Sequence, residues 1–394
     1  MFKKLILQNF KCFNDITTFD LGKINLLAGA NGRGKSTVCQ SLLLIAQSVY
    51  EYKNIECLLV NGIFVNLDLF DDLLYKDDAN NVREELCLEL ETIDNASVHK
   101  MKMGYKELSD RKGILSTLYI NGENKFAKKE NLNSEFISET ASKDASLGGY
   151  PREEVNKLFR DFYYISADRI GPTRREDKCD ECSVNPIGKL GEHRLNLLSS
   201  NTSCNQVFCP EGEDSDNLIH RTEKWLKYIM GDGTLQITGN EKESSVLDLH
   251  VGSKRTGRKY KSINVGFGYS YILSIIETAL VAPKGCVVLI ENPEAHLHPA
   301  AQSRLCRLFV SMAEYGMQLF IETHSEHILN GLRLRTIDSS VLTHEDMNIY
   351  YFNDDYKPQI VRMDKDGFIE EWPQGFFDQS DIDNLAFFTK KYRK

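Results

Sequence analysis

Hydrophobic and polar positions alternate in blocks that are typical of an α/β protein. Residues 23–28 form a short apolar run that stops at a glycine-rich stretch, and residues 36–52 then carry apolar side chains at helical spacing. Two later apolar runs, residues 286–290 and 317–321, have the length and composition of strands buried on both faces. The pattern therefore predicts parallel strands alternating with helices.

The middle of the chain follows a different pattern. Residues 76–219 contain alternating strands, a short helix at 153–162 and long charged or Asn- and Ser-rich tracts, before an amphipathic helical pattern resumes at residue 220. We read this region as an insertion of mixed α+β structure. The predicted organisation is a first α/β segment at 1–75, the inserted arm at 76–219, a second α/β segment of the same domain at 220–350 and a tail at 351–394.

Charge and composition narrow the choice of partners and compartment. Lys and Arg number 48 against 57 Asp and Glu, which gives a net charge of −9 and disfavours general attraction to nucleic acid. The sequence has no apolar run of membrane-spanning length and no secretory leader pattern. We expect a cytoplasmic protein without a membrane partner.

A glycine-rich loop supplies the first half of a nucleotide site. Residues 29–37 read GANGRGKST, follow an apolar strand and open a helix. In such a loop backbone N–H groups surround phosphates, the lysine neutralises them and the hydroxyl after it binds magnesium. The predicted ATP-binding residues are Asn31, Gly32, Arg33, Gly34, Lys35, Ser36 and Thr37, with Ser36 as a Mg²⁺ ligand.

The second half of the predicted nucleotide site follows the two later apolar strands. Glu291 ends the strand at 286–290, where its carboxylate can hold Mg²⁺ together with Ser36. His324 follows the strand at 317–321 and can reach the γ-phosphate or the attacking water, because adjacent parallel strands end in one crevice. Asn292 and Glu294 complete the predicted catalytic set.

These segments resemble the Walker A, Walker B and switch-histidine motifs of ABC-type ATPase heads. The stretches VVLIENPEAHLHP and ETHSEHIL are similar to those of bacterial AAA-family ATPases related to RecF, SMC, OLD and the PtuA ATPase of Septu defence systems. Residues 7–13, LQNFKCF, match a strand that in the family packs near the nucleotide base. The resemblance implies a P-loop NTPase fold, a mixed sheet flanked by helices, that uses ATP and Mg²⁺.

The family also has a signature segment that contacts ATP held by a second subunit. By position, residues 264–273 fill this role, with Gly268 and Ser270 at the start of a helix. The usual LSGGQ letters are absent, and a glycine turn with Ser270 as helix cap is the alternative. If the segment is the signature, ATP lies between two heads and the protein is a homodimer or higher homo-oligomer.

One position departs from the family pattern. ABC heads usually place a glutamate directly after the Walker B acid, whereas this chain has Asn292. An amide can position water but cannot act as a base. We therefore expect slow hydrolysis or ATP-gated clamping.

Two groups within residues 162–209 have open interpretations. Arg169, Arg174 and Arg175 follow an apolar strand and could grip phosphates or an acidic partner, or form a solvated basic loop. A zinc site is one reading of four cysteines and reduced unpaired thiols are the other. The cysteines are Cys179, Cys182, Cys204 and Cys209.

The leading functional hypothesis is a regulatory ATPase of an anti-phage defence complex that controls a separate effector, such as a nuclease. Only 70 residues follow His324 (324 to 394), too few for the nuclease domain that OLD-type proteins carry after the head. Nucleic acid would be reached through the complex. The alternative is a DNA repair or maintenance ATPase of the RecF/SMC type, which the acidic charge and the lack of sustained heptads disfavour. A transporter ATPase fits less well.

Overall fold

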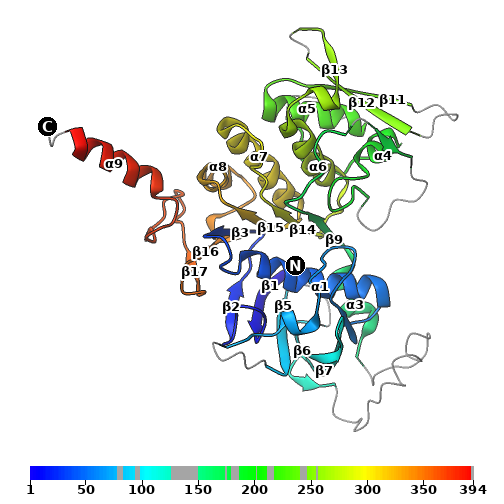
Figure 1. Cartoon of the computed structure of the whole chain (residues 1–394), viewed down its shortest axis with the longest axis vertical. Coiled ribbons are helices and arrows are strands. Elements are labelled where there is room, and N and C mark those ends of the chain that lie inside the picture. Colours follow the sequence, from blue (N-terminus) through cyan, green and yellow to red (C-terminus); the bar gives the residue numbers. More distant parts are fainter. Residues whose placement is uncertain are drawn as a thin grey trace. The chain divides into compact units, whose positions relative to one another are not determined.

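The computed structural model divides the chain into two compact units. Unit 1 comprises Met1–Gly22 and Gly32–Phe162, and unit 2 comprises Lys23–Asn31 and Tyr163–Lys394 (Figure 1). The structure describes residues 1–77, 83–93, 98–125, 150–173, 175–178, 186–200, 202–210, 217–239, 246–253 and 256–391. Each unit is described by itself.

Unit 1 is built on an antiparallel sheet. Its strands alternate buried and partly exposed positions, as in β5, so that one face packs on a core. The order is β2(Thr17–Asp20), β1(Phe2–Gln8), β5(Glu85–Thr92), β6(Lys100–Ser109), β7(Lys112–Ile120) and β4(Cys57–Leu59), with β8(Glu123–Asn124) paired to β7.

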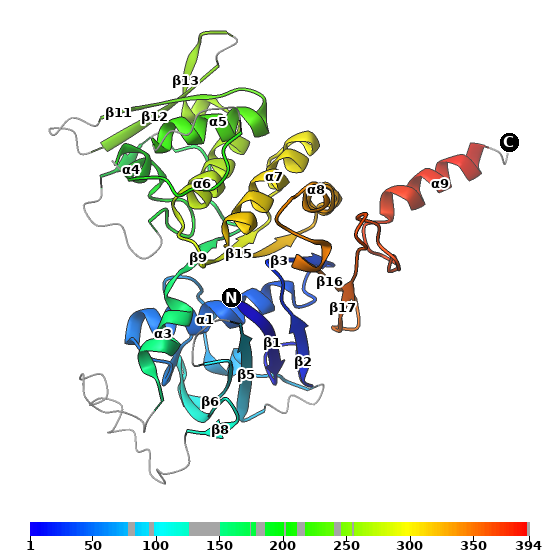
Figure 2. The same cartoon turned by 180° about the vertical axis from the view of Figure 1, so that it is seen from behind.

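The described part of unit 1 also contains α1(Lys35–Tyr52) and α3(Arg152–Arg160), which Figure 2 shows, and the 3₁₀ turn η1(Phe70–Leu73). Apolar side chains of α1 are buried almost all round. The rings of Phe2, Phe159 and Phe162 lie 5.8 to 6.1 Å apart and join β1 to α3 and the segment after it.

Unit 2 contains the predicted α/β sheet. Its order is β17(Pro358–Val361), β16(Met347–Phe352), β3(Ile24–Gly29), β15(Gln318–Thr323), β14(Val287–Glu291) and β9(Phe162–Ile165). The four strands from β16 to β14 are mutually parallel, and β17 is antiparallel to β16. All six residues of β15 are buried, as expected for a central strand. The prediction of a mixed sheet is confirmed.

Helices cover this sheet in unit 2. Figure 1 shows α6(Phe267–Val281), α7(Pro299–Tyr315) and α8(Glu326–Ile337) on one side of it. The helix α5(Leu218–Met230) packs against α6 and α7. Apolar residues of these helices and of the strands form one continuous core.

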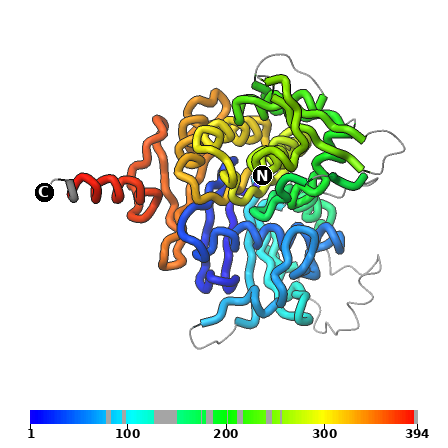
Figure 3. Tube along the Cα trace, turned by 45° about the horizontal axis from the view of Figure 1, so that its top comes forward, coloured from blue at the N-terminus to red at the C-terminus, as the bar shows by residue number. Residues whose placement is uncertain are grey.

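A second, smaller sheet lies in the part of unit 2 drawn in green (Figure 3). The order is β10(Glu176–Asp177), β12(Val246–Gly252) and β11(Thr234–Thr238), with β13(Lys259–Lys261) paired to β12. The short helix α4(Arg194–Ser199) and the 3₁₀ turn η2(Ser262–Asn264) accompany it.

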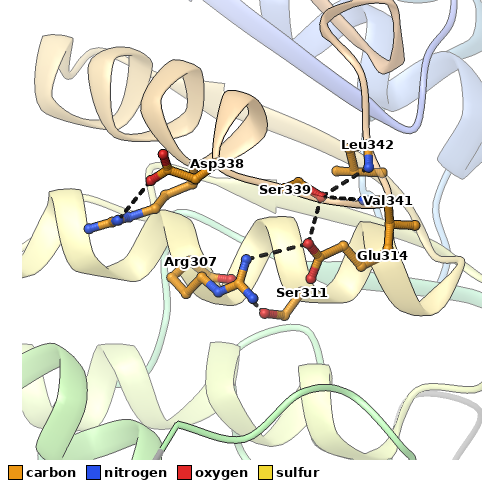
Figure 4. Close-up of polar contacts among 8 residues, drawn as sticks. Arg307, Ser311, Glu314, Asp338, Ser339, Val341 and Leu342 are labelled. Atoms are coloured by element: carbon orange, nitrogen blue, oxygen red, sulfur yellow. Dashed lines mark hydrogen bonds and ion pairs between the residues drawn. The ribbon is translucent and has the colours of Figure 1, made fainter.

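A polar network fixes the end of α8 to α7 (Figure 4). On α7, Arg307 Nη1 lies 3.4 Å from Glu314 Oε1. The Ser339 hydroxyl donates to the same oxygen at 2.7 Å and accepts from the N–H groups of Val341 and Leu342 at 3.1 and 2.9 Å. The turn that leads toward β16 is thus held by side chains of a packed helix.

After β16 and β17 the chain ends in the helix α9(Gln379–Lys391), and η3(His344–Asp346) precedes β16. Large apolar side chains of α9 are more than half exposed, among them Ile382, Leu385 and Phe388. Within the described residues, no helix is both long and apolar enough to cross a membrane.

The two units do not follow the predicted segment boundaries at 75/76 and 219/220. β5, inside the predicted insertion, pairs with β1 at the N-terminus, so residues 85–120 share a sheet with the first strands. Residues from Tyr163 onward share unit 2 with the second ATPase segment. Strand pairing between distant segments, which local patterns do not reveal, produces this division.

Glu277 of α6 is an ionisable group in the core of unit 2. It is 0% exposed, and neither carboxyl oxygen has a hydrogen-bond partner within the described residues. Burial raises the pKa of Glu277 well above its usual range, although Arg194 opposes the shift. A buried carboxyl group without hydrogen bonds is more stable protonated than charged.

We expect Glu277→Gln to stabilise the protein at pH 8. Because the folded-state pKa is raised, the native state binds the extra proton and wild-type stability falls as pH rises above about 4.3, the usual unfolded value. The amide has no such cost, so the variant should gain about 1 kcal/mol or more at pH 8 and little at pH 5. Thermal unfolding at both pH values measures this, with exposed Glu370→Gln as control. Destabilisation at pH 8 would show an ion pair with Arg194 instead.

Candidate nucleotide site

The glycine-rich loop connects β3 of unit 2 to α1 of unit 1, with the division between the units after Asn31. Gly29 ends β3 with φ 131°, and a Cβ there would collide with the backbone of Phe352 on β16. The N–H of Ala30 donates to the Phe352 carbonyl at 3.3 Å. Glycine is therefore required where the chain leaves the sheet.

The second part of the loop lies in unit 1 against residues 10–13. Gly34 has φ 103° and caps α1, and a Cβ there would lie 2.8 Å from Cys12 Sγ and 3.0 Å from the Phe13 ring. Lys11 Nζ donates to Gln40 Oε1 of α1 at 2.6 Å. The segment LQNFKCF thus packs on the loop and the helix start. Lys35 is only 3% exposed.

In unit 2 the strands that carry the other predicted residues are neighbours. β15 lies between β3 and β14, and the register pairs Glu291 with Glu322 and Thr323 with Ala28. The carboxyl ends of three parallel strands therefore meet at one edge. This edge carries Gly29 and the loop start, Glu291, and the segment beginning at His324.

Glu291 is partly buried at this edge. Burial raises the pKa of its carboxyl group, while the N–H of Ala167, which donates to Oε2 at 3.2 Å, and the Tyr164 side chain oppose the rise. A divalent cation would favour the charged form, and carboxylate and hydroxyl oxygens suit Mg²⁺. The chemistry of the Glu291 carboxylate therefore fits a magnesium ion, and the role of Ser36 as a second ligand stays a prediction.

Asn292 occupies a left-handed turn directly after β14. Its φ is 44°, a conformation that asparagine tolerates better than most residues. Its N–H donates to the Glu322 carbonyl of β15 at 2.9 Å, and within the described residues its Oδ1 has no hydrogen-bond partner although it is buried. A carboxamide at this position cannot act as a base, and its role in holding water stays a prediction.

Glu294 holds the end of β15. Its Oε2 accepts from the Thr323 hydroxyl at 2.7 Å and its Oε1 accepts from the His324 N–H at 2.8 Å. With both oxygens engaged, Glu294 orients the turn that carries His324. His324 itself is exposed.

Sequence reasoning missed Gln302 of α7. Its Oε1 accepts from the Ser325 hydroxyl at 2.6 Å, and its Nε2 donates to the Leu297 carbonyl at 2.8 Å. Ser325 in turn caps α8 by accepting from the N–H groups of His327 and Ile328. Gln302 therefore joins the Walker B segment to the helix after His324. A polar residue one turn into α7 gave no signal of this role by pattern alone.

A pocket of about 420 Å³ opens beside His324. Its walls come from the edge just described and from the beginning of the tail, which the sequence had not connected to the site. The lining includes Glu294, Gln302, His324, His327, Phe377 and Gln379.

The structure places the predicted signature residues inside unit 2. Ser270 is 1% exposed, and Gly268 is buried where a Cβ would lie 2.7 Å from the His296 carbonyl. Gly266, the helix cap, is exposed, as is Phe267 at 52%. A second copy approaching the start of α6 would meet Gly266 and Phe267 first, and the role of Gly268 and Ser270 stays a prediction.

The cysteines and arginines after β9 divide between described and undescribed residues. Cys179, Cys182 and Arg174 lie outside the described residues, while Cys204 and Cys209 are buried. Within the described ranges no group of three or more His, Cys, Asp and Glu could hold a metal ion. Zinc binding remains a prediction. Arg175 is exposed and lies 3.6 Å from Asp248.

Arg169 departs from both sequence interpretations. It is 2% exposed, so it is neither a solvated loop residue nor a surface clamp. Its guanidinium donates to the carbonyls of Glu291 and Asn292 at 2.7 and 2.6 Å. Only tertiary structure places this side chain against the Walker B turn.

The chain is similar in sequence to known proteins. The 160 best-matching residues are 26% identical to the Old nuclease of Escherichia phage P2, covering 38% of this chain and 26% of that protein. The chain thus spans about a quarter of the length of this relative. Residues 342–386 match a family described as a protein of unknown function (DUF3696).

Two solved SMC heads share the fold. The SMC head bound to the C-terminal winged-helix domain of ScpA has a TM-score of 0.51 at 14% identity, covering 92% of this chain and 98% of that one. An SMC head with an extended coiled coil, bound to the C-terminal domain of ScpA derived from Pyrococcus furiosus, also has 0.51, at 10% identity and coverage of 100% and 99%.

The fold is therefore that of an SMC-head-like, ABC-type ATPase with a P-loop. Residues 1–329 match the family model described as AAA ATPase domain, which covers both halves of the nucleotide motifs. The chain belongs to the AAA ATPase domain family, among ATPases similar to SMC and Old proteins.

Proposed function

We propose that this protein is the regulatory ATPase of a bacterial anti-phage defence complex. In this proposal two copies close on ATP and Mg²⁺ in the cytoplasm, and hydrolysis releases them, so that the nucleotide controls a separate effector subunit such as a nuclease. The observation that carries it is the sheet edge where the P-loop start, Glu291 and His324 meet. Similarity to the Old nuclease of phage P2 supports the link to phage biology.

The Walker B turn supports slow hydrolysis. Asn292 stands where ABC heads usually have a glutamate base, and both oxygens of Glu294 are engaged by Thr323 and His324. Water activation then falls to groups that orient rather than accept a proton strongly. Such a site suits a switch whose ATP-bound state persists.

The start of α6 supports a shared site. Exposed Gly266 and Phe267 lie at a helix N-terminus, whose free N–H groups favour anions. In the proposed dimer this surface faces the phosphates bound by the other copy. ATP would then increase association of the two copies.

The proposal as a whole is tested by co-expression with the product of the neighbouring gene. Copurification of a nuclease subunit whose activity changes with ATP supports it. A membrane permease as the partner would overturn it. Direct, ATP-dependent clamping of DNA without any partner would instead favour the repair-type alternative.

Lys35→Ala should abolish ATP binding and protection against phage. The lysine neutralises the β- and γ-phosphates, and losing a charge-assisted bond to phosphate costs about 2 kcal/mol or more, at least about 30-fold in affinity. Titration calorimetry and plaque counts measure the two effects, with exposed Lys259→Ala as control. If protection persisted, the nucleotide site would be dispensable.

Asn292→Glu should raise the turnover of ATP. A carboxylate at this position can act as a general base, which contributes about 10²-fold or more, partly offset by strain because the turn has φ 44°. Single-turnover hydrolysis measures the rate, with Asn292→Gln as the isosteric control without a base. Equal rates in both variants would place water activation elsewhere.

Glu294→Gln should lower hydrolysis about tenfold or more while ATP binding persists, because one of the two accepting oxygens becomes an NH₂ group that only donates, so that either Thr323 or the His324 N–H loses its acceptor. Thr323→Val removes one of the same bonds and should act in the same direction. A double-mutant cycle on single-turnover rates measures the coupling. Strictly additive effects would mean that the two residues act independently.

A further inference from the structure

We propose that Arg169 is the positioning residue of the Walker B turn, acting on Glu291 and Asn292 through their main-chain carbonyls. The proposal concerns the ATPase reaction itself and holds whatever effector the protein controls. It assigns a function to the segment after β9 that the nucleotide motifs leave unexplained.

The contacts of Arg169 are those of a clamp. One guanidinium nitrogen, Nη1, donates to the Glu291 carbonyl at 2.7 Å and to the Ser166 carbonyl at 3.2 Å, while Nη2 donates to the Asn292 carbonyl at 2.6 Å. The planar fork of arginine spans two successive carbonyls, whereas the single ammonium of lysine is a point charge. Because Asn292 lies in the left-handed region, the fork holds a turn that few residues adopt unaided.

The same loop also holds the carboxylate. The N–H of Ala167, two residues before Arg169, donates to Glu291 Oε2 at 3.2 Å. Main chain and side chain of Glu291 are thus fixed by neighbouring residues of one loop. This arrangement sets where the carboxylate oxygens point, which is what a magnesium ligand requires.

Burying the Arg169 guanidinium costs desolvation free energy, so its presence needs an explanation other than packing. Burial lowers the pKa of Arg169 to about 10, against the raising influence of Tyr271, Glu294 and Glu291. Its hydrogen-bond acceptors among the described residues are carbonyl oxygens, and Nε has no partner there. A hydrophobic side chain would fill the same space without desolvating a charge, so packing alone does not explain an arginine.

A face of the Arg169 guanidinium lies against an aromatic ring of α6. Its Cζ lies 5.0 Å from the centre of the Tyr271 ring, and Tyr271 in turn contacts the His296 ring, with centroids 4.8 Å apart. Arg169 is therefore held between α6 and the Walker B turn. Tyr271→Leu should weaken the clamp partially, because it removes the stack and leaves the hydrogen bonds.

Arg194, the first residue of α4, contacts the same loop and offers a matched control. It is 1% exposed and donates to the carbonyls of Ile170 and Gly171 at 3.1 and 3.2 Å, and among the described residues it makes no hydrogen bond to Glu291 or Asn292. Arg169→Lys and Arg194→Lys therefore disturb the same loop to a similar degree. They differ in whether Glu291 and Asn292 lose their donor.

The test compares binding and chemistry in the full-length protein. Affinity for ATP is measured in EDTA and in Mg²⁺, single-turnover hydrolysis gives the chemical rate, and thermal unfolding monitors folding. For Arg169→Lys we expect the affinity for ATP in EDTA to be unchanged, and Mg²⁺ no longer to increase that affinity. The rate of hydrolysis should fall by about 100-fold, because a small misplacement of a catalytic group has that effect. Arg194→Lys should change the rate less than about threefold at comparable stability.

Three outcomes would overturn the proposal. They are a hydrolysis rate of Arg169→Lys within about twofold of wild type, an equal fall in rate for Arg194→Lys, or a parallel loss of ATP affinity in EDTA. If wild type itself bound no ATP, the ATPase assignment and not the clamp would fail, and this is visible in the first binding measurement.

Discussion

The alignment of three parallel strand ends in unit 2 is the constraint on which the site depends. β3, β15 and β14 are hydrogen-bonded neighbours, and their register brings the P-loop start beside the ends of the other two strands. Leu26, Ile290 and Ile321 of these strands belong to the core of unit 2, and a slip of one residue would move such side chains to the opposite face of the sheet, out of that core. The candidate site residues at the three strand ends are consequently tied to one packed core.

Around this edge, polar groups are held mainly by main-chain atoms. Glu294 accepts from the His324 N–H, Asn292 donates its N–H to β15, and Arg169 donates to the Walker B carbonyls. Hydrogen bonds to main-chain atoms preorganise a site and leave other side chains free to contact a nucleotide. Glu294, Asn292 and Arg169 are thereby held in place at the strand ends of unit 2.

The sequence predicted the fold class and the ATPase family correctly because both depend on short-range patterns. The glycine loop, the strand before it and the helix after it all occupy their expected places, as α1(Lys35–Tyr52) shows. The position of Arg169 was not predictable in this way. In the sequence, a basic residue after an apolar strand looks the same whether it is solvated or buried. Arg169 is buried against carbonyls about 120 residues away in sequence. Hydrogen bonds to main-chain atoms leave no pattern in the side chains of the segment that accepts them.

By itself, therefore, the sequence determined an ATPase domain of the AAA family, because phosphate binding demands particular residue types at fixed local spacing. The roles of Glu291 and His324 stay predictions. Tertiary structure alone decided that β5 joins the N-terminal sheet, that Ser270 is buried, and that Arg169 clamps the Walker B turn. Strand pairing and burial are set by contacts between distant segments. Their energies depend on the whole packed unit rather than on any local run of residues.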